Sequence, residues 1–252
     1  MQIVRFDSLE STNKYCEALD LAQVEDFTCY WALEQTAGIG QKGNHWEAAA
    51  GENLTFSLVL HPAFLPADRQ FKLTESLSLA VVDQLSTLHS PLSTLIKWPN
   101  DIYVGGKKIC GTLISAHLST LHSPLSTLHS PLSTLHSAVC GIGLNVNQTT
   151  FPGWVPNPTS LALLTGKRFD LEPLLRQLLQ CIERRYNALR SGVDPETEYL
   201  EHLLNLGVPA RYKYKEEELT ATIIGVDPHG RLLLESSDGR RLSCGMKEIA
   251  LL

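Results

Sequence analysis

The chain has 252 residues, which is enough for one large core or for a large and a small domain. Of these residues 43% are hydrophobic and 19% are charged, as is ordinary for a soluble globular protein. Its formal net charge of −6 provides no basic field for nucleic acid, so DNA is not an expected partner. Six cysteines are scattered without a CxxC pair, which argues against a zinc site or a dense disulfide framework and indicates a reducing cytoplasm.

The N-terminal segment, MQIVRFDSLESTNKY, contains neither a signal-peptide core nor an apolar run that could span a membrane. Residues 3–6 predict a short strand, and residues 14–21 predict a helix. Ser11 or Thr12 suits its N-cap, because a hydroxyl accepts a hydrogen bond from a free N–H of the first turn. Taken alone, the two hydroxyl residues would only cap the helix.

A glycine-rich loop follows the strand that is predicted over residues 28–33. Residues 34–46 read EQTAGIGQKGNHW and place Gly38, Gly40 and Gly43 within six positions, which suits a loop that approaches another group closely. The spacing matches neither the P-loop nor the dinucleotide-binding fingerprint.

A strand is predicted over residues 52–60, and apolar spacing predicts a helix over residues 71–85. Residues 96–114, IKWPNDIYVGGKKICGTLI, then predict two buried strands joined at Gly105 and Gly106, because both positions of a two-residue turn need positive φ. The cations and acids around such a hairpin could simply form its solvated face.

A seven-residue unit, LSTLHSP, recurs in residues 85–95 and 118–137. Each complete unit ends in proline, which argues against a coiled coil, and the unit is shorter than a solenoid repeat. The spacing fixes no metal geometry for the recurring histidines, which are His89, His122, His129 and His136. We interpret the unit as a low-complexity expansion or an artefact of the recorded sequence, and we expect the second block to be an exposed loop.

Residues 138–148, AVCGIGLNVNQ, predict a buried strand with Gly141 and Gly143 on one face. Glycine weakens a strand unless something must approach its backbone closely, so a plain core strand leaves both glycines unexplained.

Two helices are predicted next, over residues 171–190 with Asp170 as the N-cap and over residues 195–204. From residue 209 onward, short alternating segments separated by turns at residues 227–230 and 237–239 predict a small β domain.

Four motifs in this order resemble the signatures of the biotin protein ligases: ESTN at 10–13, EQTAGIGQKGNHW at 34–46, KWPND with its hairpin at 97–114, and GIGLN at 141–145. The resemblance implies an α+β protein with a mixed-sheet catalytic domain of the class II synthetase-like, biotin–lipoate ligase fold over residues 1–206. A small SH3-like β-barrel would follow over residues 207–252. No helix-turn-helix segment precedes the first motif, so we expect the monofunctional type without an N-terminal DNA-binding domain.

The resemblance also implies roles for individual residues. Lys108 would be the catalytic residue, lying against the carboxylate of biotin and of the acyl-adenylate. The implied biotin-binding residues are Ser11, Thr12, Asn13, Gln35, Gly38, Ile39, Gly40, Gln41, Lys108, Gly111, Gly141 and Gly143. The implied ATP-binding residues are Trp46, Asn100, Asp101 and Asn145, and Asp101 would also contact the metal.

The chain departs from the family pattern at Ile39, where relatives usually have arginine. An arginine would offer cationic donors to a phosphate or carboxylate, and isoleucine cannot. We therefore expect weaker retention of the adenylate.

The implied activity is the formation of biotinyl-5′-AMP from biotin and ATP, with Mg²⁺ as cofactor, followed by transfer of biotin to one lysine of a biotin carboxyl carrier protein or carboxylase biotin domain. The resemblance allows a homodimer, and we expect neither DNA nor membrane as a partner. Two alternatives stay open: a lipoate or octanoate ligase of the same fold, and a degenerate biotin-binding protein with impaired catalysis.

Overall fold

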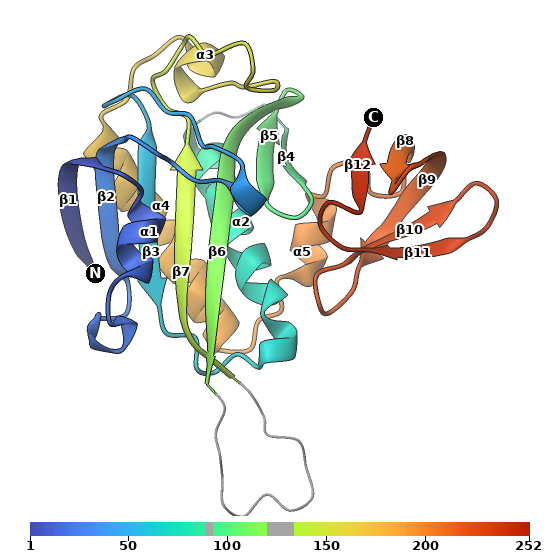
Figure 1. Ribbon diagram of the computed structural model, residues 1–252, viewed down its shortest axis with the longest axis horizontal. Coiled ribbons are helices and arrows are strands. Elements are labelled where there is room, and N and C mark those ends of the chain that lie inside the picture. Colours follow the sequence, from blue (N-terminus) through green and yellow to red (C-terminus); the bar gives the residue numbers. More distant parts are fainter. Residues whose placement is uncertain (89–92, 120–133) are drawn as a thin grey trace, which may run out of the picture.

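The computed structural model describes residues 1–88, 93–119 and 134–252 (Figure 1). In these residues the strands form a seven-stranded and a five-stranded sheet. The larger sheet has the spatial order β1 (Gln2–Leu9), β2 (Thr28–Gln35), β3 (Leu54–Leu60), β7 (Thr134–Leu144), β6 (Lys107–Ser119), β5 (Asp101–Val104) and β4 (Thr94–Lys97). Only β1 and β2 pair in parallel, so the sheet is mixed, as predicted.

Helices cover both faces of the large sheet (Figure 1). The α-helices are α1 (Thr12–Glu17), α2 (Phe71–Leu88), α3 (Leu161–Thr165), α4 (Leu171–Arg190) and α5 (Glu196–Glu201). On β3, Leu58 packs into the main core with α2 and α4, whereas Val59 packs into a smaller cluster with Cys16 of α1. Successive strand residues point to opposite faces, so α1 lies on one face of the sheet while α2 and α4 lie on the other.

The predicted hairpin is confirmed. β5 and β6 are joined by Gly105 and Gly106, whose φ angles are 58° and 76°. Both values lie in the left-handed region, which glycine enters without steric cost. The turn brings Lys108 back beside the start of β5.

The ends of both repeat blocks belong to regular structure. The first block begins inside α2, which runs to Leu88 rather than ending near residue 85, and ends in β4. In the second block Leu118 pairs with Leu135, which is fully buried. The prediction of an exposed loop is therefore wrong at both ends of this block, because β6 and β7 extend into it and Leu135 is buried in the core.

His89, His122 and His129 lie outside the described residues. His136 lies in β7, where its ring meets that of His61 edge-on at 6.3 Å.

Several helix boundaries differ from the prediction. The first helix spans only Thr12–Glu17, and a separate 3₁₀ turn, Leu21–Gln23, follows with Asp20 as its own cap. α4 has the predicted bounds, although Asp170 makes no side-chain capping hydrogen bond. α5 is shorter than predicted, at Glu196–Glu201.

The smaller sheet is wholly antiparallel and C-terminal, as predicted. Its spatial order is β11 (Arg241–Cys244), β10 (Leu232–Ser236), β9 (Glu217–Val226), β8 (Pro209–Tyr214) and β12 (Ile249–Leu251). None of the helices in the described part of the chain has the length and apolar character needed to cross a membrane.

Candidate active site

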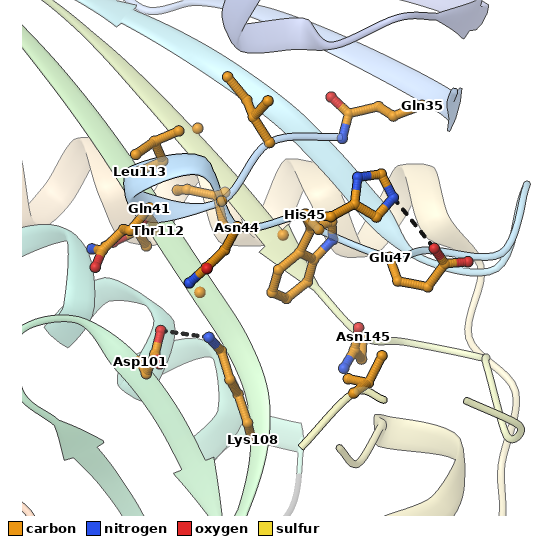
Figure 2. Close-up of a pocket in the computed structure, with 18 of the residues that line it drawn as sticks. Gln35, Gln41, Asn44, His45, Glu47, Asp101, Lys108, Thr112, Leu113 and Asn145 are labelled. Carbon is orange, nitrogen blue, oxygen red and sulfur yellow. Dashed lines mark hydrogen bonds and ion pairs between the residues drawn. The ribbon is translucent and has the colours of Figure 1, made fainter. Parts of the chain in front are cut away.

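A cavity of about 600 Å³ lies on the sheet face that carries α1 (Figure 2). It is bounded by the first turn of α1, the glycine-rich loop, β6, β7 and the segment 151–158. The predicted site residues that line it are Ser11, Thr12, Asn13, Gln35, Ile39, Gly40, Gln41, Trp46, Asp101, Lys108, Gly111, Gly141, Gly143 and Asn145.

Three glycines form the floor of the cavity. Gly111 of β6 pairs directly with Gly143 of β7, and Gly141 lies two residues before Gly143 on the same face. A Cβ at Gly141 would overlap the amide of Asn13, and a Cβ at Gly143 would overlap the indole of Trp46. The absence of side chains at these positions therefore lets two other groups reach the sheet, which explains the glycines that the sequence left unexplained.

The first turn of α1 presents polar groups to one end of the cavity. Ser11 is the N-cap, and its hydroxyl accepts a hydrogen bond from Lys14 N at 3.5 Å. Thr12 donates to Gln35 Oε1 from both its backbone N, at 2.7 Å, and its hydroxyl, at 3.1 Å. This network fixes the orientation of Gln35 toward α1.

Ser57 of β3 supports this end from beneath. Its hydroxyl lies 2.8 Å from Thr12 Oγ1 and 2.6 Å from Asn13 Oδ1. Asn13 Nδ2 is buried and has no hydrogen-bond partner in the described protein. Because buried polar groups are normally satisfied, this amide is suited to a polar ligand in the cavity.

The glycine-rich loop closes on itself above the floor. Gly40 N donates to Asn44 O at 2.7 Å, and Trp46 N donates to Gly38 O at 3.0 Å. A Cβ at Gly38 would lie 2.6 Å from the carbonyl oxygen of Trp46, so this position needs glycine for the loop to close. The closed loop places Trp46 against Gly143.

The β5–β6 hairpin supplies a pair of opposite charges to the site. Lys108 Nζ lies 2.7 Å from Asp101 Oδ1 (Figure 2). Lys108 Nζ also lies 5.7 Å from the centre of the Trp46 ring, within the range of a cation–π interaction. Two backbone hydrogen bonds hold Lys108 to the segment that covers residues 157–159. Its N donates to Asn157 O at 2.7 Å, and its O accepts from Thr159 N at 2.8 Å.

Asn145 lies at the end of the cavity where β7 leaves the sheet. Its Nδ2 donates to Thr159 O at 2.9 Å, while its Oδ1 is buried without a hydrogen-bond partner in the described chain. The Nε1 of Trp46 is also buried and unpartnered there. Unsatisfied polar atoms therefore occur at both ends of the cavity, as expected for a site that binds a long polar ligand.

Cys110 does not supply a nucleophile. Its side chain is fully buried. This burial raises the pKa of the thiol, although the nearby charge of Lys108 acts in the opposite direction. The thiol stays protonated at neutral pH, and only the thiolate is a strong nucleophile.

Two predicted residues lie outside the cavity lining. Gly38 shapes the loop, as described above. Asn100 is buried and donates to Thr112 O at 3.0 Å, while its Oδ1 accepts from Gln41 Nε2 at 2.9 Å. Asn100 therefore joins the hairpin to the glycine-rich loop from behind the cavity wall.

Sequence reasoning assigned no role to several residues that line the cavity. Those with polar or aromatic side chains include Asn44, His45, Glu47, Phe151 and Trp154. His45 contacts two of these residues, with its Nε2 at 3.4 Å from Glu47 Oε2 and its ring at 6.1 Å from that of Trp154. The proline-rich composition of residues 151–158 indicated a loop but gave no signal that it turns toward the glycine floor.

The chain is similar to known ligases along most of its length. A family model described as the biotin/lipoate A/B protein ligase family matches residues 5–125. The chain is 30% identical to a bifunctional ligase/repressor BirA of Bacillus subtilis, covering 94% of this chain and 70% of that protein. It is also 30% identical to a biotin–[acetyl-CoA-carboxylase] ligase of Paracoccus denitrificans, covering 92% of this chain and 94% of that protein.

A solved structure is similar over the whole chain. It is the biotin protein ligase from Aquifex aeolicus in complex with biotin and ATP, with a TM-score of 0.78 and 25% sequence identity. The match covers 100% of this chain and 98% of that one.

Proposed function

Because this chain belongs to the biotin protein ligase family, we propose that it activates biotin with ATP and transfers the biotinyl group to one lysine of a biotin carboxyl carrier protein. One observation carries the proposal: a single cavity runs over a glycine floor from the polar turn of α1 to the Asp101–Lys108 pair. The first end suits a neutral polar ring, and the second suits anionic groups.

In the first step, a carboxylate oxygen of biotin attacks the α-phosphorus of ATP. A new O–P bond forms, the bond between the α-phosphorus and its bridging oxygen breaks, and pyrophosphate leaves. Both reacting groups are anionic, so a fixed cation beside them lowers the barrier. We assign this role to Lys108, whose ammonium is held by Asp101 at 2.7 Å.

In the second step, the neutral ε-amine of the acceptor lysine attacks the acyl carbon of biotinyl-5′-AMP. An amide forms, the bond from carbon to the phosphate oxygen breaks, and AMP leaves as the amine loses a proton. Neither step needs a nucleophile from the protein, so its contribution is positioning and charge neutralisation. The loop over residues 38–46 would exclude water from the mixed anhydride.

ATP fits the end of the cavity that holds Trp46 and Asn145, where an aromatic face and unsatisfied polar atoms lie together. Among the described residues, no group of three or more His, Cys, Asp and Glu side chains could hold a metal ion. We propose that Mg²⁺ would be bound together with the nucleotide and that Asp101 would contact it. Bound in this way, Mg²⁺ would neutralise phosphate charge.

Three further assignments stay proposals. We assign residues 1–206 to a catalytic domain and residues 207–252 to a C-terminal domain, and we place the protein in the cytoplasm. The location is supported by the six cysteines, all of which are free and buried. The homodimer that the family resemblance allows stays a prediction.

The experiment is acceptor labelling. Purified protein is mixed with MgATP, biotin and a carrier domain, and avidin-detectable label is compared with a parallel lipoate reaction. Label with biotin alone supports the proposal, and lipoate label would favour the lipoate ligase alternative. Retained biotin binding without any label would favour the degenerate alternative.

The assignment of Lys108 is tested in the same assay. Lys108→Ala should abolish adenylate formation, whereas Lys107→Ala should not, because Lys107 is exposed on the same hairpin and does not line the cavity. Full activity of Lys108→Ala would exclude its role.

A further inference from the structure

The C-terminal sheet touches the site only indirectly. Among the described residues, those that line the cavity all precede position 159. The turn between β9 and β10 nevertheless lies against the large sheet, where Gly230 O accepts a hydrogen bond from Trp98 Nε1 at 3.1 Å. Trp98 belongs to the turn between β4 and β5.

A second path joins the same two turns. Gly230 packs so closely on Phe71 that a Cβ would overlap the ring. The Phe71 ring meets that of Tyr199 edge-on at 5.7 Å, and Tyr199 OH donates to Pro99 O at 2.8 Å. Gly230 is thus connected to two consecutive residues of the β4–β5 turn, directly to Trp98 and through two aromatic rings to Pro99.

The next two residues of the chain contact elements of the active site. Asn100 accepts from Gln41 of the glycine-rich loop at 2.9 Å, and Asp101 holds Lys108 at 2.7 Å. The residues that the C-terminal sheet holds are therefore adjacent in the chain to those that orient the loop and the catalytic ammonium.

The turn that carries Gly230 is itself rigid. Asp227 Oδ1 accepts from His229 N at 3.0 Å and from Arg231 N at 2.9 Å, and Gly230 N donates to Asp227 O at 2.8 Å. This pattern is an Asx turn, which fixes the backbone without a contribution from the large sheet. Gly230 has a φ of 81°, which favours glycine there.

We propose that Gly230, Trp98 and Tyr199 are positioning residues, through which the C-terminal sheet fixes Asn100 and Asp101 and hence the glycine-rich loop and Lys108. None of the three contacts the reacting groups. The kinetic consequence rests on the proposed function, but the positioning itself is a property of the fold. Both are therefore measured.

The primary test compares Gly230→Ala with Gly239→Ala. Both glycines lie in turns of the C-terminal sheet with similar φ, 81° and 85°, so both substitutions carry the same backbone strain. A Cβ at Gly239 would meet nothing within 4 Å, whereas one at Gly230 would overlap Phe71. We expect Gly230→Ala to raise the KM for ATP by about fivefold or more, the effect of losing one hydrogen bond. Gly239→Ala should change this KM by no more than about twofold.

Two conservative variants test the hydrogen bonds one at a time and remain informative if Gly230→Ala fails to fold. Trp98→Phe removes the indole N–H and keeps an aromatic ring. Tyr199→Phe removes the hydroxyl from a fully buried ring, and Tyr212→Phe is its control, since Tyr212 is a buried tyrosine of β8 whose hydroxyl makes no hydrogen bond to the β4–β5 turn in the described part of the chain.

Hydrogen exchange of the same proteins gives a readout that needs no activity. Trp98→Phe and Tyr199→Phe should each speed exchange severalfold in peptides covering residues 97–104 and 38–46, and Tyr212→Phe should not. Unchanged exchange in both peptides would overturn the proposal, whatever the enzyme activity. If the two variants exchange faster than the wild type, but the wild type forms no biotinyl-adenylate, the positioning is supported and the proposed function is contradicted.

Discussion

Gln41 donates a hydrogen bond to Asn100 at 2.9 Å, and this contact joins the glycine-rich loop to the turn that precedes the catalytic hairpin. The two residues are 59 positions apart in the chain. Both are neutral amides, so the contact depends on geometry and hardly on pH or salt. It therefore connects the position of the glycine-rich loop to that of the turn before the hairpin.

Gln41→Ala should raise the KM for ATP by about fivefold, because one buried amide–amide hydrogen bond contributes about 1 kcal/mol. Asn100→Ala should have a larger effect, since it also removes the bond to Thr112 O. Steady-state kinetics of both single variants and the double variant measure the coupling. If the effects of the two substitutions simply add, the contact does not transmit position.

Ile39→Arg should slow the escape of biotinyl-adenylate about tenfold, because a guanidinium would add a charge-assisted hydrogen bond to an anionic intermediate. Ile39 lines the cavity, and its bridge to His45 is a backbone pairing that the substitution leaves in place. Adenylate release is measured with radiolabelled biotin in the absence of acceptor. Ile39→Met is the control for side-chain volume, and equal release rates in both variants would show that charge at this position is unimportant.

Gly141→Ala should weaken biotin binding at least fivefold, because the new methyl group would overlap the Asn13 amide and overpacking typically costs about 1–3 kcal/mol. Calorimetric titration with biotin measures the change. Gly153→Ala is the matched control, since a Cβ there would meet nothing within 4 Å. Wild-type affinity in Gly141→Ala would contradict the placement of biotin beside Asn13.

Glu75 should make stability depend on pH. Its side chain is almost fully buried in α2, and burial raises its pKa to about 7, although Lys72 opposes the shift. The folded state therefore holds this proton more tightly than the unfolded chain, whose glutamate pKa is about 4.3. The stabilisation is complete below about pH 4 and is lost as pH rises to about 7, with a total of up to about 4 kcal/mol.

Urea unfolding between pH 4 and 8 tests this dependence. Glu75→Gln should flatten the slope of unfolding free energy between about pH 4 and 7. Glu196→Gln should retain it, because Glu196 contacts the same Lys72 but has a side chain that is 46% exposed. An unchanged slope in Glu75→Gln would assign the pH dependence to other groups.

Local sequence features predicted much of the fold. The paired glycines at 105 and 106 predicted the hairpin, because only a short list of residues accepts positive φ in succession. The helix predicted over residues 171–190 is observed as α4 with the same bounds. The motif order predicted the family, and most of the residues assigned to the site line one cavity.

The sequence by itself determined features that depend on a few neighbouring residues: turns, helix periodicity and the positions where glycine must stand. The tertiary structure alone decided which groups use the space that those glycines leave, namely Asn13 over Gly141 and Trp46 over Gly143. It also decided that Asn100 supports the loop from behind the cavity and that Gly230 reaches Trp98. The physical reason is that these contacts join residues tens to more than a hundred positions apart, and no local period or propensity encodes which distant side chain fills a given space.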